Sequence, residues 1–429
     1  MRASTICVIG GGYVGIPTAA ILSLRGHQVV LAENNELRLA ALQQGNIPIF
    51  EPGLEALVEQ AITAGTLSFS KSAAEAVKDC EYVFLCVPTP QDDDGSADLS
   101  YVMEAVHEIR AQLKPGCVVV NKSTVPVGTA LLVEREISRA DVKVASNPEF
   151  LREGSAVEDS LKPDRIVVGS NDTHTAKMVA ELFANPGSAT VITDCVTAES
   201  IKYAANAFLA TKISFINEAA AFCDAVGADM RDLVLGMGFD RRIGFEVMQP
   251  GPGWGGSCFP KDTRALVKIG EDHGYDFSLV RGAIESNKNQ FQRVVDKIEA
   301  LVGDLKGVTV AIWGLTFKAN TDDRRSSPAI PVVATLLARG ALVRAYDPTV
   351  QPSDESSDLA GITISGSAEE AATGAEVLVI LTEWTEFRWM NLSNIAPLMG
   401  KTNIVDTRNM LDPEAAKRNG FTYLGMGRS

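Results

Sequence analysis

A short glycine-rich segment holds the cysteine with the clearest chemical potential. Cys258 follows Gly253-Trp-Gly-Gly-Ser257 and precedes Phe-Pro-Lys261-Asp262. Glycines let the backbone approach a ligand closely, and the Lys261 cation favours the thiolate, which is the nucleophilic form of cysteine. Of the seven cysteines, only Cys258 lies outside an apolar run. The residues leave two interpretations open, a catalytic nucleophile or a structural loop cysteine.

A second chemical signature lies near the start of the chain. Gly10-Gly-Gly12-Tyr13-Val14-Gly15 satisfies the pattern G-x-G-x-x-G, between a strand-like run and a helical pattern over residues 16–24. These glycines let a pyrophosphate approach the backbone, and the helix N-terminus supplies N–H donors and a positive dipole end. The segment therefore predicts a dinucleotide site.

Glu33 indicates which dinucleotide binds, because it ends the next strand about 20 residues further on. A carboxylate there accepts hydrogen bonds from a ribose 2′-hydroxyl and repels a 2′-phosphate, which favours NAD over NADP. The alternative for Glu33 is a solvent-facing strand end. Arg38 either covers the adenine or accommodates a phosphate, and we expect NAD as the cofactor.

The elements that position these groups alternate between strand and helix. The first strand-like runs are residues 5–9, 28–32, 82–87, 117–121, 142–145 and 165–168. This alternation predicts an α/β fold, in which a doubly wound parallel sheet carries helices on both faces. Pro88, Thr89 and Thr124 follow such runs and should lie at the carboxyl edge of the sheet, where ligands bind. We place this domain at residues 1–196.

A helical segment and a second α/β domain complete the expected organisation. Residues 197–223 contain no Gly or Pro and are apolar on more than one face, as in a long helix buried against both domains or a second subunit. We expect a central helical domain at 197–302 and a Rossmann-like domain at 303–429. The last has strand-like runs at 308–313, 341–346, 377–381 and 403–405, and residues 351–358 form a predicted solvated loop.

The two α/β domains also echo each other in sequence. Each contains a helical run, a glycine, a strand and an acidic residue, which is Glu33 in the first domain and Asp347 in the second. We expect two such domains to form a cleft that holds cofactor and substrate face to face.

Composition excludes several classes of protein. The 429 residues are 46% hydrophobic and 22% charged, as in a folded protein of two or three domains. The net charge of −15 disfavours nucleic-acid and anionic-membrane partners. No apolar stretch reaches the length of a membrane span, the cysteines lack zinc-site spacings, and the first residues lack a signal-peptide pattern. We therefore expect a cytoplasmic protein without a metal.

Collinear motifs give the chain a strong resemblance to the UDP-glucose/GDP-mannose dehydrogenase family of nucleotide-sugar dehydrogenases. In chain order they are Gly10–Gly15, Val87–Pro90, Ser123–Pro126, Ser146–Glu153, Lys202–Asn206, Gly255–Asp262, Phe317–Arg325 and Asp406–Arg408. The segment from Cys258 to Asp262 is similar to the UDP-glucose branch rather than the acetamido-sugar branch. GDP-mannose and a UDP-N-acetylhexosamine stay as alternative substrates.

The resemblance implies a two-step, four-electron oxidation of a UDP-sugar alcohol to a carboxylate. Two NAD molecules would each take a hydride, and Cys258 would trap the aldehyde as a thiohemiacetal that becomes a thioester. Lys202 and Asn206 are spaced i,i+4, so they share one helix face, and the resemblance implies that they stabilise an oxyanion. The residues alone would make Lys202 a solvated helix lysine.

The same resemblance assigns the proton-transfer groups. Asp262 and Thr124 would orient a water together with Lys202, and Glu149 would be the base in thioester hydrolysis, with Glu153 as a second candidate. Without the resemblance, Glu149 and Glu153 are equally well explained as carboxylates at a helix start.

The resemblance further implies the contacts of both ligands. Expected cofactor contacts are Gly10, Gly12, Tyr13, Val14, Gly15, Glu33, Arg38, Pro88, Thr89, Thr124, Glu153, Lys261 and Arg325. Expected substrate contacts are Glu149, Phe150, Leu151, Arg152, Glu153, Lys202, Asn206, Arg242, Gly255, Cys258, Phe317, Lys318 and Arg408. Lys318 and Arg408 would bind the pyrophosphate. Arg242 would reach the substrate of a neighbouring subunit, which implies a homodimer or higher oligomer.

One departure from the family pattern concerns two neighbouring arginines. Arg324 stands where the family usually has an aliphatic residue, and Ser326 stands where a Glu is common. The assignment of the cofactor contact between Arg324 and Arg325 therefore stays open.

Two other classes of protein are distinguishable from this interpretation. A simple two-electron hydroxyacid dehydrogenase would have no use for Cys258 or a second α/β domain. A protein that only senses NAD would not need Lys202, Asn206 and Cys258 together.

Overall fold

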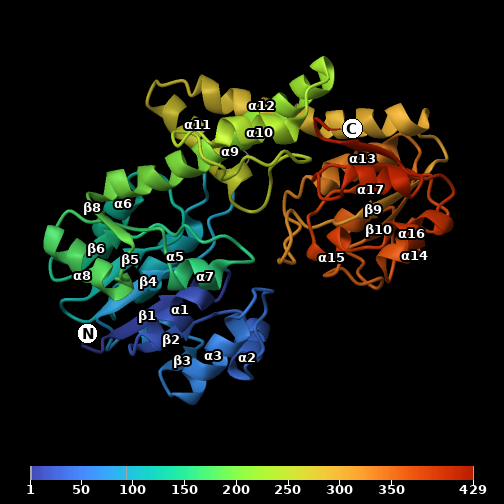
Figure 1. Cartoon of the computed structure of the whole chain (residues 1–429). Coiled ribbons are helices and arrows are strands. Elements are labelled where there is room, and N and C mark those ends of the chain that lie inside the picture. The colour runs from blue at the N-terminus through green and yellow to red at the C-terminus, as the bar shows by residue number, and fades with distance from the viewer. Residues whose placement is uncertain (1, 93, 429) are drawn as a thin grey trace. The chain divides into compact units, whose positions relative to one another are not determined.

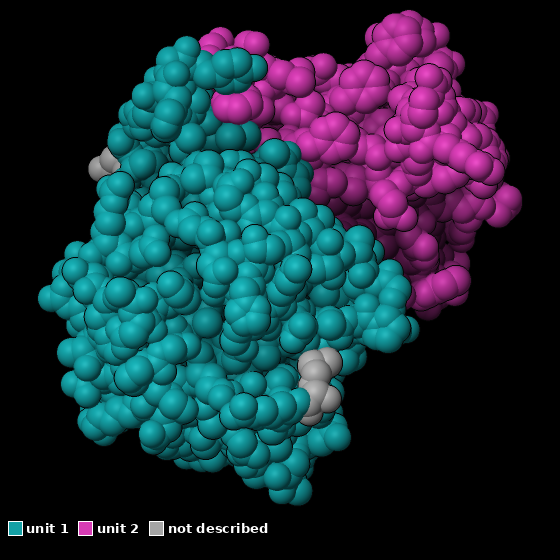
Figure 2. Space-filling model, turned by 90° about the vertical axis from the view of Figure 1, so that its left-hand side faces the viewer, with its two compact units in different colours: residues 1–205, 264–275 teal, residues 206–263, 276–429 magenta. Residues whose placement is uncertain are grey.

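The computed structural model describes residues 2–92 and 94–428, which form two compact units (Figures 1 and 2). The first unit comprises the residues up to 205 together with 264–275, and the second comprises residues 206–263 and those from 276 onward. Helices α9 (Cys195–Val226) and α11 (Phe259–Asp272) each pass from one unit to the other.

The first unit contains a sheet of eight strands in the order β3-β2-β1-β4-β5-β6-β7-β8. Its elements are β1 (Thr5–Ile9), α1 (Gly15–Leu24), β2 (Gln28–Ala32), α2 (Glu36–Gln43), α3 (Leu54–Thr63), β3 (Leu67–Ser70), α4 (Ala73–Ala76), β4 (Tyr82–Leu85), α5 (Ser100–Ile109), β5 (Val118–Asn121), α6 (Thr129–Ile137), β6 (Lys143–Ser146), α7 (Ala156–Leu161), β7 (Arg165–Gly169), α8 (Thr173–Phe183) and β8 (Ala189–Thr193). This order confirms the doubly wound α/β prediction.

Two features of this sheet differ from the prediction. Strand β7 pairs antiparallel to β6 at Ser146 and Gly169, so β7 and β8 run against the other strands. The connection from β6 to β7 contains the six-residue α7, and β7 returns along the sheet in the opposite direction. Strands β3 and β8 were not predicted, because β3 is the short polar run Leu-Ser-Phe-Ser and the first residues of β8 are exposed.

The first sheet is buried on both faces because its strands are apolar at successive positions. In β1, Ile6 and Val8 face the helices α1, α3 and α8, while Cys7 and Ile9 face α5 and α6. Alternate side chains of a strand point to opposite faces, so a continuous apolar run serves both layers. This arrangement leaves the strand ends and the following loops to carry polar groups.

The second unit combines a helical part with a sheet of six parallel strands, in the order β11-β10-β9-β12-β13-β14. After α9 the elements are α10 (Met230–Gly238), α11, α12 (Ser278–Val302), β9 (Thr309–Trp313), α13 (Ala329–Ala338), β10 (Leu342–Tyr346), η1 (Ser357–Leu359), β11 (Ile362–Ile364), α14 (Ala368–Ala372), β12 (Val377–Ile380), α15 (Thr385–Arg388), α16 (Leu392–Ile395), η2 (Ala396–Leu398), β13 (Asn403–Asp406), α17 (Pro413–Arg418) and β14 (Thr422–Gly425). A second Rossmann-like sheet and a helical segment before it are thereby confirmed.

The second sheet repeats the two-layer packing of the first. In β9, Val310 and Ile312 pack with α12 and α13, while Ala311 and Trp313 pack with α14 to α17. The very apolar runs β9 and β12 are both central strands, as expected for a parallel sheet covered on both faces. None of the helices in the described part of the chain is long and apolar enough to span a membrane.

Candidate active site

The glycine-rich turn after β1 has the geometry of a dinucleotide site. A side chain on Gly15 would clash with the carbonyl oxygen of Gly10, 1.8 Å from the added carbon, so the helix can start only with glycine there. A carbon added to Gly12 would meet nothing within 4 Å. The first turn of α1 has neither a side-chain cap nor an acidic residue, which leaves its N-terminus suited to an anion.

Glu33 lies against this turn and is not a solvent-facing strand end. Its side chain is 4% exposed, and its Oε2 accepts a hydrogen bond of 2.9 Å from the Gly11 N–H. Its Oε1 accepts another of 2.8 Å from the Asn35 N–H. The carboxylate is therefore fixed at the rim of the glycine turn, where a ribose hydroxyl would be recognised.

Arg38 pairs with the same carboxylate. Its Nη1 lies 3.3 Å from Glu33 Oε2, and its side chain is 43% exposed. An arginine that is already neutralised by a neighbouring carboxylate is a poor receptor for a 2′-phosphate. The open space at Gly12, the uncapped helix start and Glu33 together fit NAD.

The loops after β4 and β5 are tied to each other at the same sheet edge. The Thr89 hydroxyl donates to the Thr124 carbonyl at 2.8 Å, and the Ser123 hydroxyl donates to the Val87 carbonyl at 2.7 Å. At the sheet edge expected to receive a ligand, the loop of Pro88 and Thr89 and the loop of Thr124 are therefore joined by hydrogen bonds.

Lys202 and Glu149 form a buried ion pair within the first unit. Lys202 Nζ donates to Glu149 Oε1 at 2.8 Å, and the two side chains are 4% and 6% exposed. Burial alone would raise the pKa of Glu149, but the charge and hydrogen bond of Lys202 and the Leu151 N–H outweigh it, so the pKa lies below its ordinary value. Glu149 is therefore a carboxylate at neutral pH, and Lys202 is not a solvated helix lysine.

The loop that carries Glu149 also holds several of the expected substrate contacts. Two cations contact the Phe150 ring: the Arg165 guanidinium carbon lies 3.7 Å and Lys202 Nζ lies 5.4 Å from its centre. Arg152 does not contact this pair, because its guanidinium forks onto Asp159 and its side chain is 66% exposed. Leu151 contributes its backbone N–H, and Glu153 lies in the same loop.

Two residues that support this loop were missed from the sequence. Glu51 is buried and accepts hydrogen bonds from the Gly154 and Ala156 N–H groups, each at 2.7 Å, which caps α7. Lys122 is also buried, and its Nζ donates to Asn147 at 3.0 Å, while burial lowers its pKa. A charge directly after the apolar run of β5 was a signal for Lys122, whereas Glu51 acts on a loop about 100 residues away and gave none.

In the second unit, Asp262 joins Asn206, an expected catalytic residue, to Lys261, an expected cofactor contact. Asp262 is fully buried, and its two oxygens accept one hydrogen bond each, from Asn206 Nδ2 at 2.6 Å and from Lys261 Nζ at 2.6 Å. Asn206 and Lys202 lie one turn apart on α9, as their spacing predicted. A buried carboxylate needs such partners, so Asp262 fixes the directions of the amide and the ammonium group.

Cys258 lies immediately before α11 and is the one partly exposed cysteine among the seven. Its carbonyl accepts the first helical hydrogen bond, from Asp262 N–H at 2.9 Å. Cys258 thus stands at the N-terminus of a helix, where the helix dipole favours an anionic group. The other cysteines are buried, and burial raises the pKa of Cys86 to about 12, so they are unsuited to this chemistry.

The loop before Cys258 packs against the second α/β domain within the same unit. A carbon added to Gly256 would lie 2.8 Å from the Phe317 ring, and one added to Gly251 would lie 3.1 Å from Arg408 Nη1. Arg408 donates to the Phe317 carbonyl at 3.1 Å and pairs with Glu383 at 3.0 Å. Lys318 Nζ lies 5.5 Å from the Phe317 ring centre. Phe317, Lys318 and Arg408 are thus gathered beside the glycines of the Cys258 loop.

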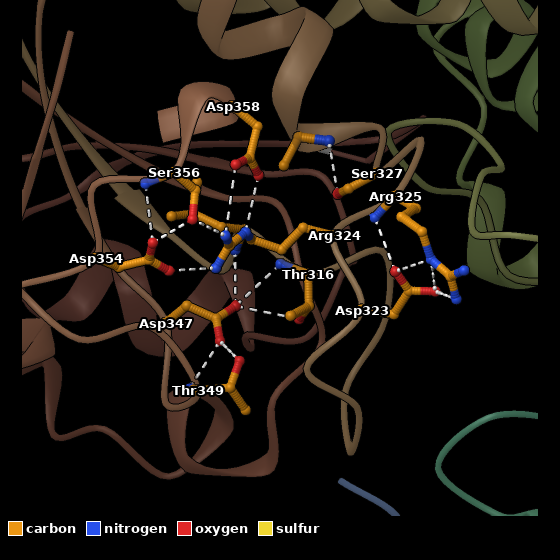
Figure 3. A network of polar contacts seen from close by, with 12 residues as sticks. Thr316, Asp323, Arg324, Arg325, Ser327, Asp347, Thr349, Asp354, Ser356 and Asp358 are labelled. Carbon is orange, nitrogen blue, oxygen red and sulfur yellow. Dashed lines mark hydrogen bonds and ion pairs between the residues drawn. The ribbon is translucent and has the colours of Figure 1, made fainter. Parts of the chain in front are cut away.

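The structure separates the roles of Arg324 and Arg325. Figure 3 shows Arg324 among Asp354, Ser356 and Asp358, whereas Arg325 folds back on Asp323. The Arg324 side chain is only 17% exposed, whereas that of Arg325 is 60% exposed, so Arg325 is the more accessible of the two. Arg242 is also outward-facing, with a side chain that is 89% exposed and paired with Asp240.

Comparison with known proteins agrees with this geometry. Three family models match the chain: the NAD binding domain of the UDP-glucose/GDP-mannose dehydrogenase family over residues 4–186, its central domain over 196–289 and its UDP binding domain over 311–413.

Similar proteins extend over nearly the whole chain. A UDP-glucose 6-dehydrogenase of Rhizobium meliloti is 45% identical and covers 99% of both chains. One of Pseudomonas aeruginosa is 43% identical over 99% of this chain and 97% of its own. The structure of a UDP-glucose dehydrogenase from Pyrobaculum islandicum superposes with a TM-score of 0.92 at 36% identity, covering 100% of this chain and 98% of the other. The chain therefore belongs to the UDP-glucose/GDP-mannose dehydrogenase family.

Proposed function

We propose that this protein is a UDP-glucose 6-dehydrogenase, which oxidises UDP-glucose to UDP-glucuronate with NAD. The observation that carries the proposal is the placement of Cys258 at the head of α11, beside the Asp262 hydrogen bonds to Asn206 and Lys261. A hydroxyacid dehydrogenase or a protein that only binds NAD has no use for that arrangement. The names of the full-length relatives support UDP-glucose as the substrate.

NAD supplies the hydride acceptor when it is bound. Its pyrophosphate would lie on the open side of Gly12 at the start of α1, and its ribose hydroxyls would bind Glu33. Tyr13, Val14, Pro88, Thr89, Thr124, Glu153, Lys261 and Arg325 complete the proposed contacts.

The substrate alcohol first loses a hydride and a proton, which gives an aldehyde at C6. The Cys258 thiolate then adds to that carbon and forms a thiohemiacetal. Loss of a second hydride converts it to a thioester, and water hydrolyses the thioester to a carboxylate and the free thiol. Two NAD molecules are reduced, which balances the four electrons lost from the alcohol.

The chain supplies groups for each step of this sequence. Asn206 and Lys202 stabilise the oxyanion, and Asp262 and Thr124 orient a water for proton transfer. Glu149 is held as a carboxylate by Lys202, so it accepts a proton from the hydrolytic water without first having to ionise. Lys318 and Arg408 bind the pyrophosphate of the substrate beside Phe317.

The direct test is the stoichiometry of NADH on a panel of substrates. We expect two NADH for each UDP-glucose consumed, and little NADH from GDP-mannose or UDP-N-acetylmannosamine. A ratio of one NADH would eliminate the four-electron mechanism. Faster turnover of GDP-mannose would reassign the substrate while leaving the mechanism standing.

The assembly that we propose is a homodimer formed through α9. Phe208, Phe215 and Phe222 recur every seventh residue on that helix and are 68%, 54% and 59% exposed. Seven residues make about two helical turns, so these rings form one apolar stripe along the helix. Exposure of such a stripe to water is unfavourable, which favours its burial against a second copy of the chain. The exposed Arg242 would then reach the substrate bound to the partner subunit. In this arrangement residues 1–196 would bind NAD, residues 197–302 would form the dimer, and residues 303–429 would bind the UDP-sugar.

Sedimentation equilibrium tests this assembly. We expect a dimer for the natural chain and a monomer for Phe215→Glu. A monomeric natural chain would refute the proposed interface.

The cytoplasmic location expected from the sequence stays a prediction.

A further inference from the structure

Arg324 connects two segments of the second α/β domain. Its Nε lies 2.8 Å from Asp358 Oδ2, its Nη1 lies 2.9 Å from Asp354 Oδ2, and its Nη2 donates to the Ser356 hydroxyl at 3.1 Å (Figure 3). The three partners belong to residues 351–358, which we call the acidic loop. The loop was predicted to be merely solvated, but one guanidinium holds it to the turn of residues 323–327.

The turn of residues 323–327 needs outside support. Ser326 has a φ of +50°, in the left-handed region that is unfavourable for a residue other than glycine. Two hydrogen bonds close the turn, from Ser327 N–H to the Arg324 carbonyl at 3.0 Å and from Arg325 N–H to Asp323 at 2.9 Å. Such a conformation persists only where the surroundings determine it, and the Arg324 side chain is its bridge to the acidic loop.

The same turn is the surface on which the Cys258 loop rests. A carbon added to Gly255 would lie 2.0 Å from the Ser326 carbonyl oxygen and 2.9 Å from Pro328 Cδ. Backbone therefore lies directly on backbone here, three residues before Cys258. On its other side the loop is held by a hydrogen bond of 2.8 Å from the Trp254 N–H to Asn287. A shift of the turn would be transmitted to Gly255, because the contact consists of the Ser326 backbone and the rigid Pro328 ring, neither of which has a rotamer that could adjust.

We propose that Arg324 is a positioning residue for Cys258: its ion pairs with the acidic loop fix the turn that supports the cysteine's loop. Arg324 itself does not touch the reacting atoms. The importance of this support for turnover rests on the proposed function, in which Cys258 is the nucleophile.

Charge explains why a cation is needed at this position. Asp354 and Asp358 both direct an oxygen to the one guanidinium, so without it two carboxylates would face each other across the loop. With an aliphatic residue in place of Arg324, the carboxylates of Asp354 and Asp358 would repel each other, and no ion pair would hold the acidic loop to the turn.

Hydrogen exchange of the resting enzyme and steady-state kinetics test the proposal together. In Arg324→Leu we expect exchange in residues 253–258 to quicken about tenfold, and kcat to fall about tenfold while the KM for UDP-glucose stays within about twofold. Arg324→Lys, which can bind one carboxylate, should lie between. Arg339→Leu is the matched control, because Arg339 pairs with Glu299 in the same unit and should change neither quantity.

The carboxylate side provides an independent variant. Asp354→Asn with Asp358→Asn should reproduce both changes, and adding Arg324→Leu should cause little further loss, since all three remove one interaction. Unchanged exchange in residues 253–258 of Arg324→Leu, with faster exchange confined to the acidic loop, would overturn the proposal. Additive losses of kcat would do the same. The exchange result needs no substrate, so it decides the proposal even if UDP-glucose proves to be the wrong sugar nucleotide.

Discussion

Both α/β domains place an acidic residue directly after their second strand, β2 in the first domain and β10 in the second, but the two carboxylates have different partners. Glu33 at the end of β2 accepts from Gly11 and Asn35 and pairs with Arg38, beside the open space at Gly12. Asp347 follows β10, is fully buried, and its Oδ2 accepts from Leu315 N–H at 2.8 Å, Thr316 N–H at 3.0 Å and Trp384 Nε1 at 3.1 Å. Its other oxygen accepts from Thr349.

The difference lies in the turn that each carboxylate meets. After β1, the glycine turn leads directly into α1, so the carboxylate and the helix N-terminus are left for a ligand. After β9, a long loop precedes α13, and a carbon added to Gly314 would lie 2.3 Å from Thr382. One fold thus serves a cofactor in the first domain and, in the second, supports a loop that carries Phe317, Lys318 and the arginines.

The largest expected effect is the loss of turnover on replacing Cys258, which acts in the reaction itself, whereas Glu33 and Asp347 act in cofactor binding and in stability. In Cys258→Ser, turnover of UDP-glucose to the carboxylate should fall about 10³-fold or more, because serine is a far weaker nucleophile at neutral pH. NAD and UDP-glucose should bind nearly as before, by isothermal titration. Activity close to that of the natural chain would remove Cys258 from the mechanism.

Asp347→Ala should affect stability rather than the cofactor. It leaves several buried N–H donors unsatisfied, so we expect the free energy of unfolding to drop by about 3 kcal/mol in urea titrations. The Kd for NAD should stay within about twofold. A large loss of NAD affinity with unchanged stability would mean that the second domain also binds the dinucleotide.

A buried carboxylate in the first unit should give a pH signature. Glu199 on α9 accepts from the Gly128 and Ala130 N–H groups at 2.6 and 2.8 Å, and burial raises its pKa from 4.5 to about 7. The native state then holds a proton between about pH 4.5 and 7 that the unfolded state has lost, so stability falls as the pH rises through this window. We expect a loss of about 2 kcal/mol from pH 5 to 8 that Glu199→Gln abolishes. Equal slopes in both proteins, measured by urea unfolding, would contradict this.

The smallest expected effect is that of Glu33 on the choice of cofactor. Glu33→Ala should raise the KM for NAD about tenfold by removing the acceptor for the ribose hydroxyls, and should lower the KM for NADP. Steady-state kinetics with both cofactors measures the change. If the preference for NAD persists in full, Glu33 acts only as a structural partner of Gly11, and the two domains are more alike than we propose.

Much of the fold followed from periodicity in the sequence. Strands such as β1 and β9 are continuous apolar runs followed directly by glycine, and the long α9 is free of Gly and Pro. The edge strands β3 and β11 were missed because their short runs bury little apolar surface. The reversal of β7 could not be predicted, since strand direction depends on how the connection crosses the sheet.

The sequence by itself determined the chemical types present: a glycine turn with a following carboxylate, a cysteine among glycines, and a lysine and an asparagine one helical turn apart. Such features depend on neighbours within a few residues, and local backbone rules specify them. Only the tertiary structure decided that Lys202 pairs with Glu149, that Asp262 binds Asn206, and that Arg324 rather than Arg325 holds the acidic loop. These contacts join residues far apart in the chain, where burial and charge select the partner and no local pattern records the choice.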